Sequence, residues 1–204
     1  MFARLALLSL AVATASAAPT VPDTTQAPVD SCAGLGSGAF DTADNFTLAA
    51  FYTSLPNANA TGLPLVLGSV AATDGAEYKA LSTFGSFPYN QWTSLSLING
   101  VLTGSGEDVP DAQAMSVPTG KALSFVTPPQ GAAPQIFCAV ADTDPAHGGF
   151  PQLAVNGDTD SFSLCPETTA PNALVNIVYN PDEGAQDYVF EQCTPVALHL
   201  VGLY

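Results

Sequence analysis

The chain has 204 residues, of which 47% are hydrophobic and 10% are charged. Its 18 Asp and Glu residues, set against 3 Lys and Arg residues, give a formal net charge of −15 at pH 7. Such a charge repels phosphate backbones and anionic membrane surfaces, so nucleic acid is not an expected partner. The length and the hydrophobic content are sufficient for one domain with a substantial core, and they argue against disorder throughout.

The first 17 residues have the layout of a secretory signal peptide. Arg4 supplies the positive charge, residues 5–13 form an apolar core, and small residues precede a cleavage site after Ala17. That core is too short to span a bilayer, and no later segment has 18 continuous apolar residues, so no membrane span is expected. We therefore expect a secreted protein whose mature chain begins at residue 18.

Residues 18–40 are rich in Pro, Thr and Gly and lack apolar periodicity, which predicts a flexible N-terminal segment. From residue 41 to 204, short β-branched and aromatic runs alternate with turn residues, as in an all-β domain. The expected strands are 46–52, 63–67, 77–81, 94–98, 101–103, 121–127, 135–141, 153–155, 162–164, 176–179, 188–190 and 196–203.

The number and spacing of these strands predict one compact all-β domain without helices. Seventeen prolines and 17 glycines leave no room for a long helical stretch. We expect a β-trefoil-like barrel, because closure removes exposed strand edges, with a two-sheet β-sandwich as the alternative. Asn99-Gly100 and Asn156-Gly157 each predict a hairpin, because Asn-Gly adopts the positive φ angles of a type I′ turn.

The chain contains four cysteines, an even number that suits disulfides in a secreted protein. Three pairings are possible. We favour Cys165 with Cys193, the nearest pair, and Cys32 with Cys138, which would pin the start of the domain to a central strand. The absence of Cys-x-x-Cys argues against zinc or redox use.

Two Asn-x-Thr sequons accompany the secretion signal and predict N-glycosylation. Asn59 lies in a turn-rich stretch between prolines and is expected to be exposed. Asn45 lies at the start of a strand and is expected to be less accessible.

Two acidic stretches contain residue types that can bind metal ions. Asn156, Asp158, Asp160 and Glu167 superficially follow the ligand spacing of an EF-hand loop, but strands flank them and the turn glycine is missing. The stretch 142–147 offers two carboxylates and an imidazole, in a context typical of a solvated loop. We predict no metal and no cofactor, and acidic turns at both places.

No motif predicts a hydrolase. The chain has two histidines, His147 and His199, and it lacks a nucleophile elbow, a zinc-binding helix and a phosphate-binding loop. His199 is expected on a strand with a satisfied ring nitrogen. A glycosidase with two carboxylates stays open as an alternative, because 18 acidic residues cannot be narrowed to a pair.

The densest aromatic stretch is residues 84–92, which contains Phe84, Phe87, Tyr89 and the single tryptophan, Trp92. Exposed aromatic faces beside Asn and Gln suit stacking on sugar rings, so Phe87, Tyr89 and Trp92 are candidate carbohydrate contacts. The alternative is that Phe84, Phe87 and Trp92 fill the core where strands cross.

Several short motifs carry a resemblance to a known group of proteins. They are Leu-Pro-Leu-Val-Leu-Gly at 63–68, Ser-Leu-Ser-Leu-Ile-Asn-Gly at 94–100, Phe-Ser-Leu-Cys-Pro at 162–166, Val-Tyr-Asn-Pro at 178–181, and Cys193. With them the chain resembles small secreted proteins of filamentous, mostly basidiomycete, fungi, and more distantly it is similar to phialide-type cell-wall proteins. The resemblance implies an extracellular or wall-associated protein, and it carries over no catalytic or binding residue.

Three functional hypotheses follow. The first is a secreted, non-enzymatic, wall-associated or extracellular protein with weak affinity for cell-wall polysaccharide. The second is a carboxylate-dependent enzyme acting on glycans. The third is an effector-like protein-interaction module.

Overall fold

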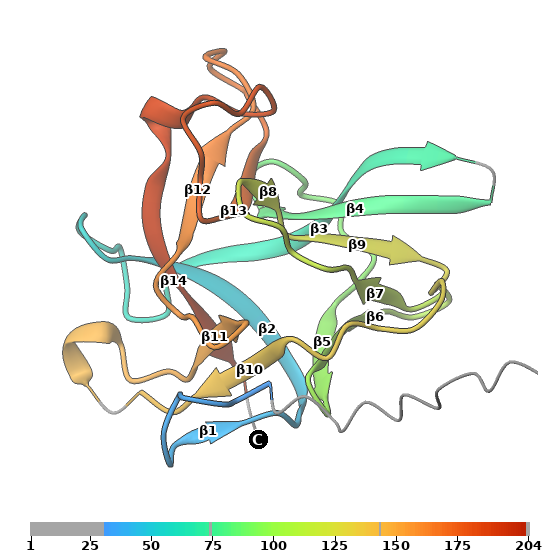
Figure 1. Ribbon diagram of the computed structural model, residues 1–204. Coiled ribbons are helices and arrows are strands. Elements are labelled where there is room, and N and C mark those ends of the chain that lie inside the picture. Colours follow the sequence, from blue (N-terminus) through green and yellow to red (C-terminus); the bar gives the residue numbers. More distant parts are fainter. Residues whose placement is uncertain (1–30, 74, 143, 203–204) are drawn as a thin grey trace, which may run out of the picture.

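The computed structural model describes residues 31–73, 75–142 and 144–202. The signal peptide predicted at residues 1–17 and the segment 18–30 lie outside the described residues. Strands dominate the described residues and the helical part is limited to two short 3-10 turns, so the all-β prediction is confirmed (Figure 1). Among the described residues no helix is long and apolar enough to cross a membrane.

Fourteen strands and two short 3-10 helices are found in the described part of the chain. They are β1 (Ala39–Phe40), β2 (Ala43–Tyr52), β3 (Leu63–Thr73), β4 (Ala76–Thr83), β5 (Ser94–Ile98), β6 (Val101–Ser105), β7 (Ala112–Ala114), β8 (Lys121–Ala122), β9 (Ser124–Thr127), β10 (Phe137–Val140), η1 (Pro145–His147), β11 (Gln152–Val155), β12 (Phe162–Pro166), β13 (Val175–Tyr179), η2 (Phe190–Gln192) and β14 (Thr194–Val201).

Nine antiparallel strands close into a barrel, so the barrel is confirmed over the sandwich. The ring runs β2, β5, β6, β7, β9, β4, β13, β12 and β14, and β14 pairs back onto β2. The other strands attach to this ring: β3 joins β2 to β4, β8 lies beside β13, and β11, β10 and β1 continue outward from β14. Closure leaves no free edge within the ring itself.

The core lies inside this ring, where alternate residues of each strand point. On β14, Val196, Leu198 and Leu200 join the main hydrophobic cluster, which is the two-residue period expected of a strand. The opposite face, with Ala197 and His199, is buried as well. This strand is therefore covered on both sides.

The two Asn-Gly turns have different outcomes. Asn99 and Gly100 have φ of 50° and 76° and connect the paired strands β5 and β6, so the first hairpin is confirmed. Asn156 and Gly157 also have positive φ angles, but they close only a single bridge between Val155 and Asp158. The second hairpin prediction is wrong, because β11 pairs with β10 and β14, and β12 pairs with β13 and β14.

The strand predicted at residues 188–190 is also wrong. Tyr188 accepts a hydrogen bond at 2.8 Å from the backbone N–H of Asp182 and packs in a small cluster with Cys165 and Val178. The chain then passes through η2 to reach Cys193. The aromatic residue therefore covers a disulfide instead of joining a sheet.

Both predicted disulfides are present. Cys165 and Cys193 are bridged with a Cα–Cα distance of 4.2 Å, and Cys32 and Cys138 with a distance of 5.3 Å. The Cys32–Cys138 bridge corrects the prediction of a flexible segment for residues 31–40. Cys32 and the pairing of β1 with β10 fasten this part of the chain to the domain.

Candidate functional site

A cleft of about 480 Å³ opens beside the long β3–β4 hairpin. The hairpin and the end of β9 extend toward the same side of the barrel (Figure 1). The tip of that hairpin, the loop before β5, the loop between β6 and β7, and the end of β9 form the walls of the cleft. Its lining residues are Ala72, Thr73, Gly75, Ala76, Glu77, Gln91, Trp92, Val109, Pro110, Thr127 and Pro128.

The hairpin forms a wall because the outer half of β3 runs past its pairing with β2, while β4 stays paired with β9 as far as Glu77. β3 pairs with β2 only through Leu63 and Pro64, whereas its pairing with β4 continues to Thr73. The register shifts between Ser69 and Ala71, and such an irregularity bends a strand locally. On β3, Ala72 and Thr73 beyond this shift are small and exposed, and they line the cleft together with Ala76 and Glu77 of β4.

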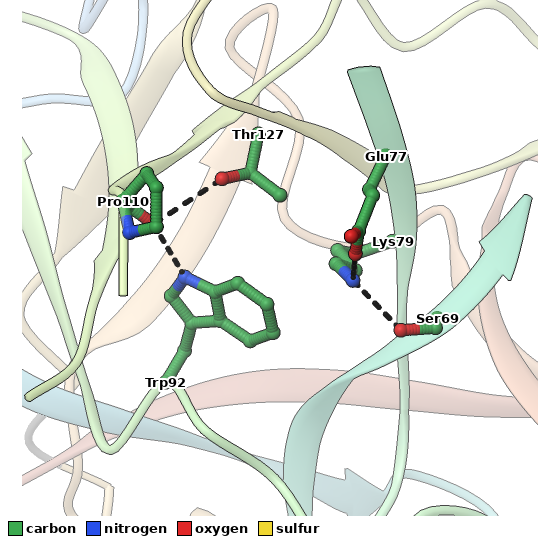
Figure 2. A network of polar contacts seen from close by, with 6 residues as sticks. All are labelled: Ser69, Glu77, Lys79, Trp92, Pro110 and Thr127. Carbon is green, nitrogen blue, oxygen red and sulfur yellow. Dashed lines mark hydrogen bonds and ion pairs between the residues drawn. The ribbon is translucent and has the colours of Figure 1, made fainter. Parts of the chain in front are cut away.

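A buried lysine lies behind the cleft. Lys79 stands two residues before the core residue Leu81 on β4, so alternation turns its side chain toward the interior, where it is 1% exposed. Its Nζ donates hydrogen bonds to Oγ of Ser69 at 2.7 Å and to Oε2 of Glu77, and it lies 4.7 Å from the centroid of the Trp92 ring (Figure 2). A buried ammonium needs such partners, since desolvation alone is costly.

Trp92 is part of the core and not an open stacking platform, which corrects the carbohydrate-contact prediction for this residue. It is 7% exposed, and its Nε1 donates a hydrogen bond at 3.1 Å to the carbonyl of Pro110. The hydroxyl of Thr127 donates to the same carbonyl at 3.2 Å (Figure 2). The indole packs near Gly104, where a Cβ would lie 3.5 Å from its Cδ1. Only a small part of the ring therefore reaches the cleft.

The rest of the aromatic stretch divides in two. Phe87 packs on the backbone of Gly68, where an added Cβ would overlap its ring, so Phe87 holds the loop against the barrel. Tyr89 is 96% exposed and Phe84 is exposed as well. Of the three predicted sugar contacts, Tyr89 is therefore the one with an open ring.

Gln91, Glu77 and Lys79 are the site residues that sequence reasoning missed. Gln91 is exposed on the rim, and its backbone carbonyl approaches Gly106 so closely that no Cβ would fit there. This close contact fixes the position of the Gln91 backbone, from which the side chain extends into the cleft. One signal for Lys79 was visible: in the expected strand 77–81, Lys79 and Glu77 share a face with the apolar Leu81.

The acidic loop considered as a metal site is held by hydrogen bonds within the protein. Oδ2 of Asp142 accepts a hydrogen bond from Gln152 at 2.6 Å and lies 3.3 Å from Nδ1 of His147. Burial opposes ionisation of Asp142, but hydrogen bonds from the Asp144 amide and Gln152, together with His147, lower its pKa. The described residues include no group of three or more His, Cys, Asp or Glu placed to hold a metal ion.

The EF-hand-like stretch is an acidic turn. Asp158 accepts hydrogen bonds from the Asp160 amide at 2.8 Å and from the Tyr179 hydroxyl at 3.2 Å. Burial opposes its ionisation, but these bonds and those from Ser161 outweigh burial, so the pKa of Asp158 is lowered. Glu167 accepts from Nδ2 of Asn176 at 2.9 Å. Asp158 therefore stabilises the turn, whereas Glu167 lies beyond the far end of β12 and binds β13.

His199 is fully buried between two aromatic rings. Its ring centroid lies 4.7 Å from that of Phe51 and 5.7 Å from that of Phe150, and its Nδ1 donates to the carbonyl of Thr61 at 3.1 Å. The Nδ1 partner confirms the expected satisfied nitrogen, whereas Nε2 is buried and has no hydrogen-bond partner among the residues that the structure describes. Burial lowers the pKa of His199, against the opposing effects of the Thr61 carbonyl and Asp142.

A pH dependence of stability follows from this burial. In the unfolded chain His199 binds a proton near pH 6.5, whereas the folded protein binds it only at lower pH, so the unfolded state carries more protons in between. The contribution of neutral His199 to the free energy of unfolding is fully present above pH 6.5. It falls as the pH drops below that value, by up to about 1.4 kcal/mol per pH unit. Urea unfolding measured from pH 7 to pH 5 should show this slope, and His199→Phe should flatten it. An equal slope in both proteins would contradict the assignment.

Both predicted glycosylation sites are exposed. Asn59 lies in the loop between β2 and β3, and Asn45 lies near the start of β2 with a φ of 55°. The expectation that Asn45 is less accessible is not supported by its exposure. The positive φ coincides with the place where the pairing of β2 with β5 shifts register.

No protein-family model matches the chain, and neither the curated proteins nor the solved structures give a significant match.

Proposed function

We propose that this is a secreted, non-catalytic protein of the extracellular space or cell wall that binds polysaccharide in the cleft beside the β3–β4 hairpin. The observation that carries the proposal is the cleft itself, which combines exposed polar side chains with an apolar floor. Sugars present hydroxyl groups around a ring with apolar C–H faces, so they suit a site of this composition.

The cleft offers complementary hydrogen-bonding groups. The Glu77 carboxylate accepts hydrogen bonds, the Gln91 amide both donates and accepts them, and the edge of Trp92 with Val109 provides apolar surface. Glu77 is held in place by its ion pair with Lys79. Tyr89, two residues before Gln91 on the same loop, adds an exposed ring on which a further sugar can stack.

The cleft favours binding over hydrolysis. Glycosidases use two carboxyl groups on either side of the scissile bond. Among the described residues that line the cleft, Glu77 is the one carboxylate, and it is engaged by the ammonium of Lys79. A single paired carboxylate is suited to holding a sugar hydroxyl.

Several features of the chain support the proposed extracellular location. Two disulfides fit an oxidising compartment, and residues 1–17 have the layout of a signal peptide. Asn45 and Asn59 are exposed, which suits glycan attachment at both. The resemblance to secreted fungal proteins supports the cell wall as the location.

The experiment is retention of the purified secreted protein on insoluble chitin, β-glucan and mannan, beside single-residue variants. Gln91→Ala and Tyr89→Ala each remove an exposed side chain, so the fold should be unaffected. Each is expected to weaken retention about fivefold to tenfold, the effect of one lost hydrogen bond or stacking contact.

The matched control is Gln186→Ala, which removes an exposed amide from the loop between β13 and η2. Its retention should equal that of the unmodified protein. Trp92→Ala is not a suitable test, because it opens a cavity in the core. Retention that is insensitive to both Gln91→Ala and Tyr89→Ala, or no retention on any polymer, would rule out this site.

A further inference from the structure

A second hollow, of about 540 Å³, lies between the loop that carries Asn59 and the loop that contains η1. Apolar and polar groups alternate around it. Its lining residues are Phe51, Tyr52, Thr53, Leu55, Pro56, Asn57, Asn59, Ala60, Ala146, His147 and Gly148. Leu55 is 52% exposed here and presents apolar surface to the hollow.

The loop beside the hollow is ordered by its own hydrogen bonds. The Asn57 side chain exchanges two hydrogen bonds of 2.9 Å with the backbone of Tyr52. Oδ1 of Asn59 accepts from the backbone N–H groups of Thr61 at 3.0 Å and of Gly62 at 2.8 Å. The side chain of Asn59 is therefore fixed in orientation, not free to rotate.

Contacts with the rest of the domain hold the loop in place. The carbonyl of Thr61 accepts the hydrogen bond from buried His199. The carbonyl of Ala60 approaches Gly148 so closely that no Cβ would fit at that position, and Gly148 has a φ of 83°, which favours glycine. The contact between Ala60 and Gly148 therefore holds the two walls of the hollow together, and the hydrogen bond from His199 attaches the Asn59 loop to β14.

We propose that this hollow seats the first N-acetylglucosamine of a glycan attached to Asn59. The inference rests on secretion, as proposed above, and goes beyond the cleft. Attachment forms a bond between Nδ2 of Asn59 and C1 of the sugar. Nδ2 loses a proton, and the diphosphate of a lipid-linked oligosaccharide donor leaves. Because Oδ1 is turned into the loop, Nδ2 on the other arm of the amide is left for the sugar.

The lining of the hollow fits this sugar. The apolar face of the ring and the methyl of its acetamide can cover Leu55, Pro56 and Ala146. Its amide and hydroxyls can hydrogen-bond with polar groups of the lining such as Asn57 and His147. A sugar placed here would explain why Leu55 is left open in the bare chain.

The test compares three forms of the secreted protein, each with the Asn45 sequon removed by Thr47→Ala. They carry the full glycan, a single N-acetylglucosamine left by endoglycosidase H trimming, or no glycan because of Thr61→Ala. The single sugar is expected to raise Tm by about 2–4 °C over the unglycosylated form, and the full glycan should add little more.

The matched variants are Leu55→Ala in the hollow and Ile98→Ala on β5, whose side chains are 52% and 50% exposed. Leu55→Ala should abolish the gain from the single sugar, and Ile98→Ala should preserve it. A mass without glycan at Asn59, an unchanged Tm, or a gain that survives Leu55→Ala would each overturn the inference. Polysaccharide retention is read separately, because Thr61→Ala leaves the cleft intact.

Discussion

Replacing both Cys32 and Cys138 by alanine is expected to lower the free energy of unfolding by about 4–5 kcal/mol. The bridge spans 106 residues, and the entropy that a cross-link removes from the unfolded chain grows with the length of the loop it closes. It also fastens the start of the domain to β10, beside which β1 pairs. A loss of this size is a large part of the stability of a typical domain.

This loss of stability is to be compared with that caused by replacing both Cys165 and Cys193. The bridge between these two residues closes a loop of 28 residues. The same reasoning gives about 3.5 kcal/mol for that bridge, so the longer loop should be the more stabilising. Urea unfolding of the two double variants, followed by circular dichroism, checks the order. If the short bridge proved more stabilising by several kcal/mol, the entropic account would fail.

Glu77→Ala is expected to destabilise the protein by about 3 kcal/mol, although Glu77 is largely exposed. The reason is its partner: Lys79 is buried, and without Glu77 the partners of its ammonium among the described residues are the Ser69 hydroxyl and the face of Trp92. Lys79→Met should cost less, about 1 kcal/mol, because it removes the buried charge and leaves Glu77 and Ser69 near water.

The difference between the stability losses of Glu77→Ala and Lys79→Met is measured by denaturant unfolding of both single variants and of the double variant. The double variant should be close to Lys79→Met alone, because Glu77 has no buried charge left to satisfy. A Lys79→Met variant less stable than Glu77→Ala would mean that packing of the lysine stem on Trp92 dominates over its charge.

Local signals predicted the turns of this fold better than its strand partners. Asn99-Gly100 and Asn156-Gly157 both adopt the positive φ angles that their sequence favours. Only the first joins two strands that pair with each other, because β12, the strand after the second turn, pairs with β13 and β14. Turn chemistry acts over four residues, whereas the choice of partner depends on closure of the whole ring.

The candidate site was predicted in part. The aromatic stretch does border the cleft, but its density could not show that Trp92 faces inward and Tyr89 outward, because loops have no side-chain period. Lys79 was visible as an interior position on a strand. Its partners could not be foreseen, because Ser69 and Trp92 meet it only after β3, β4 and the loop before β5 come together.

The measurement that tests the central claim most directly is a fluorescence titration with soluble oligosaccharides of the polymer that retains the protein. Trp92 is the single tryptophan of the chain and lines the cleft, so it reports binding there without a label. The proposal predicts a saturable change in its emission, shifted about fivefold to tenfold to higher concentration in Gln91→Ala. An oligosaccharide that binds the protein yet leaves the emission of Trp92 unchanged would contradict a sugar site in this cleft.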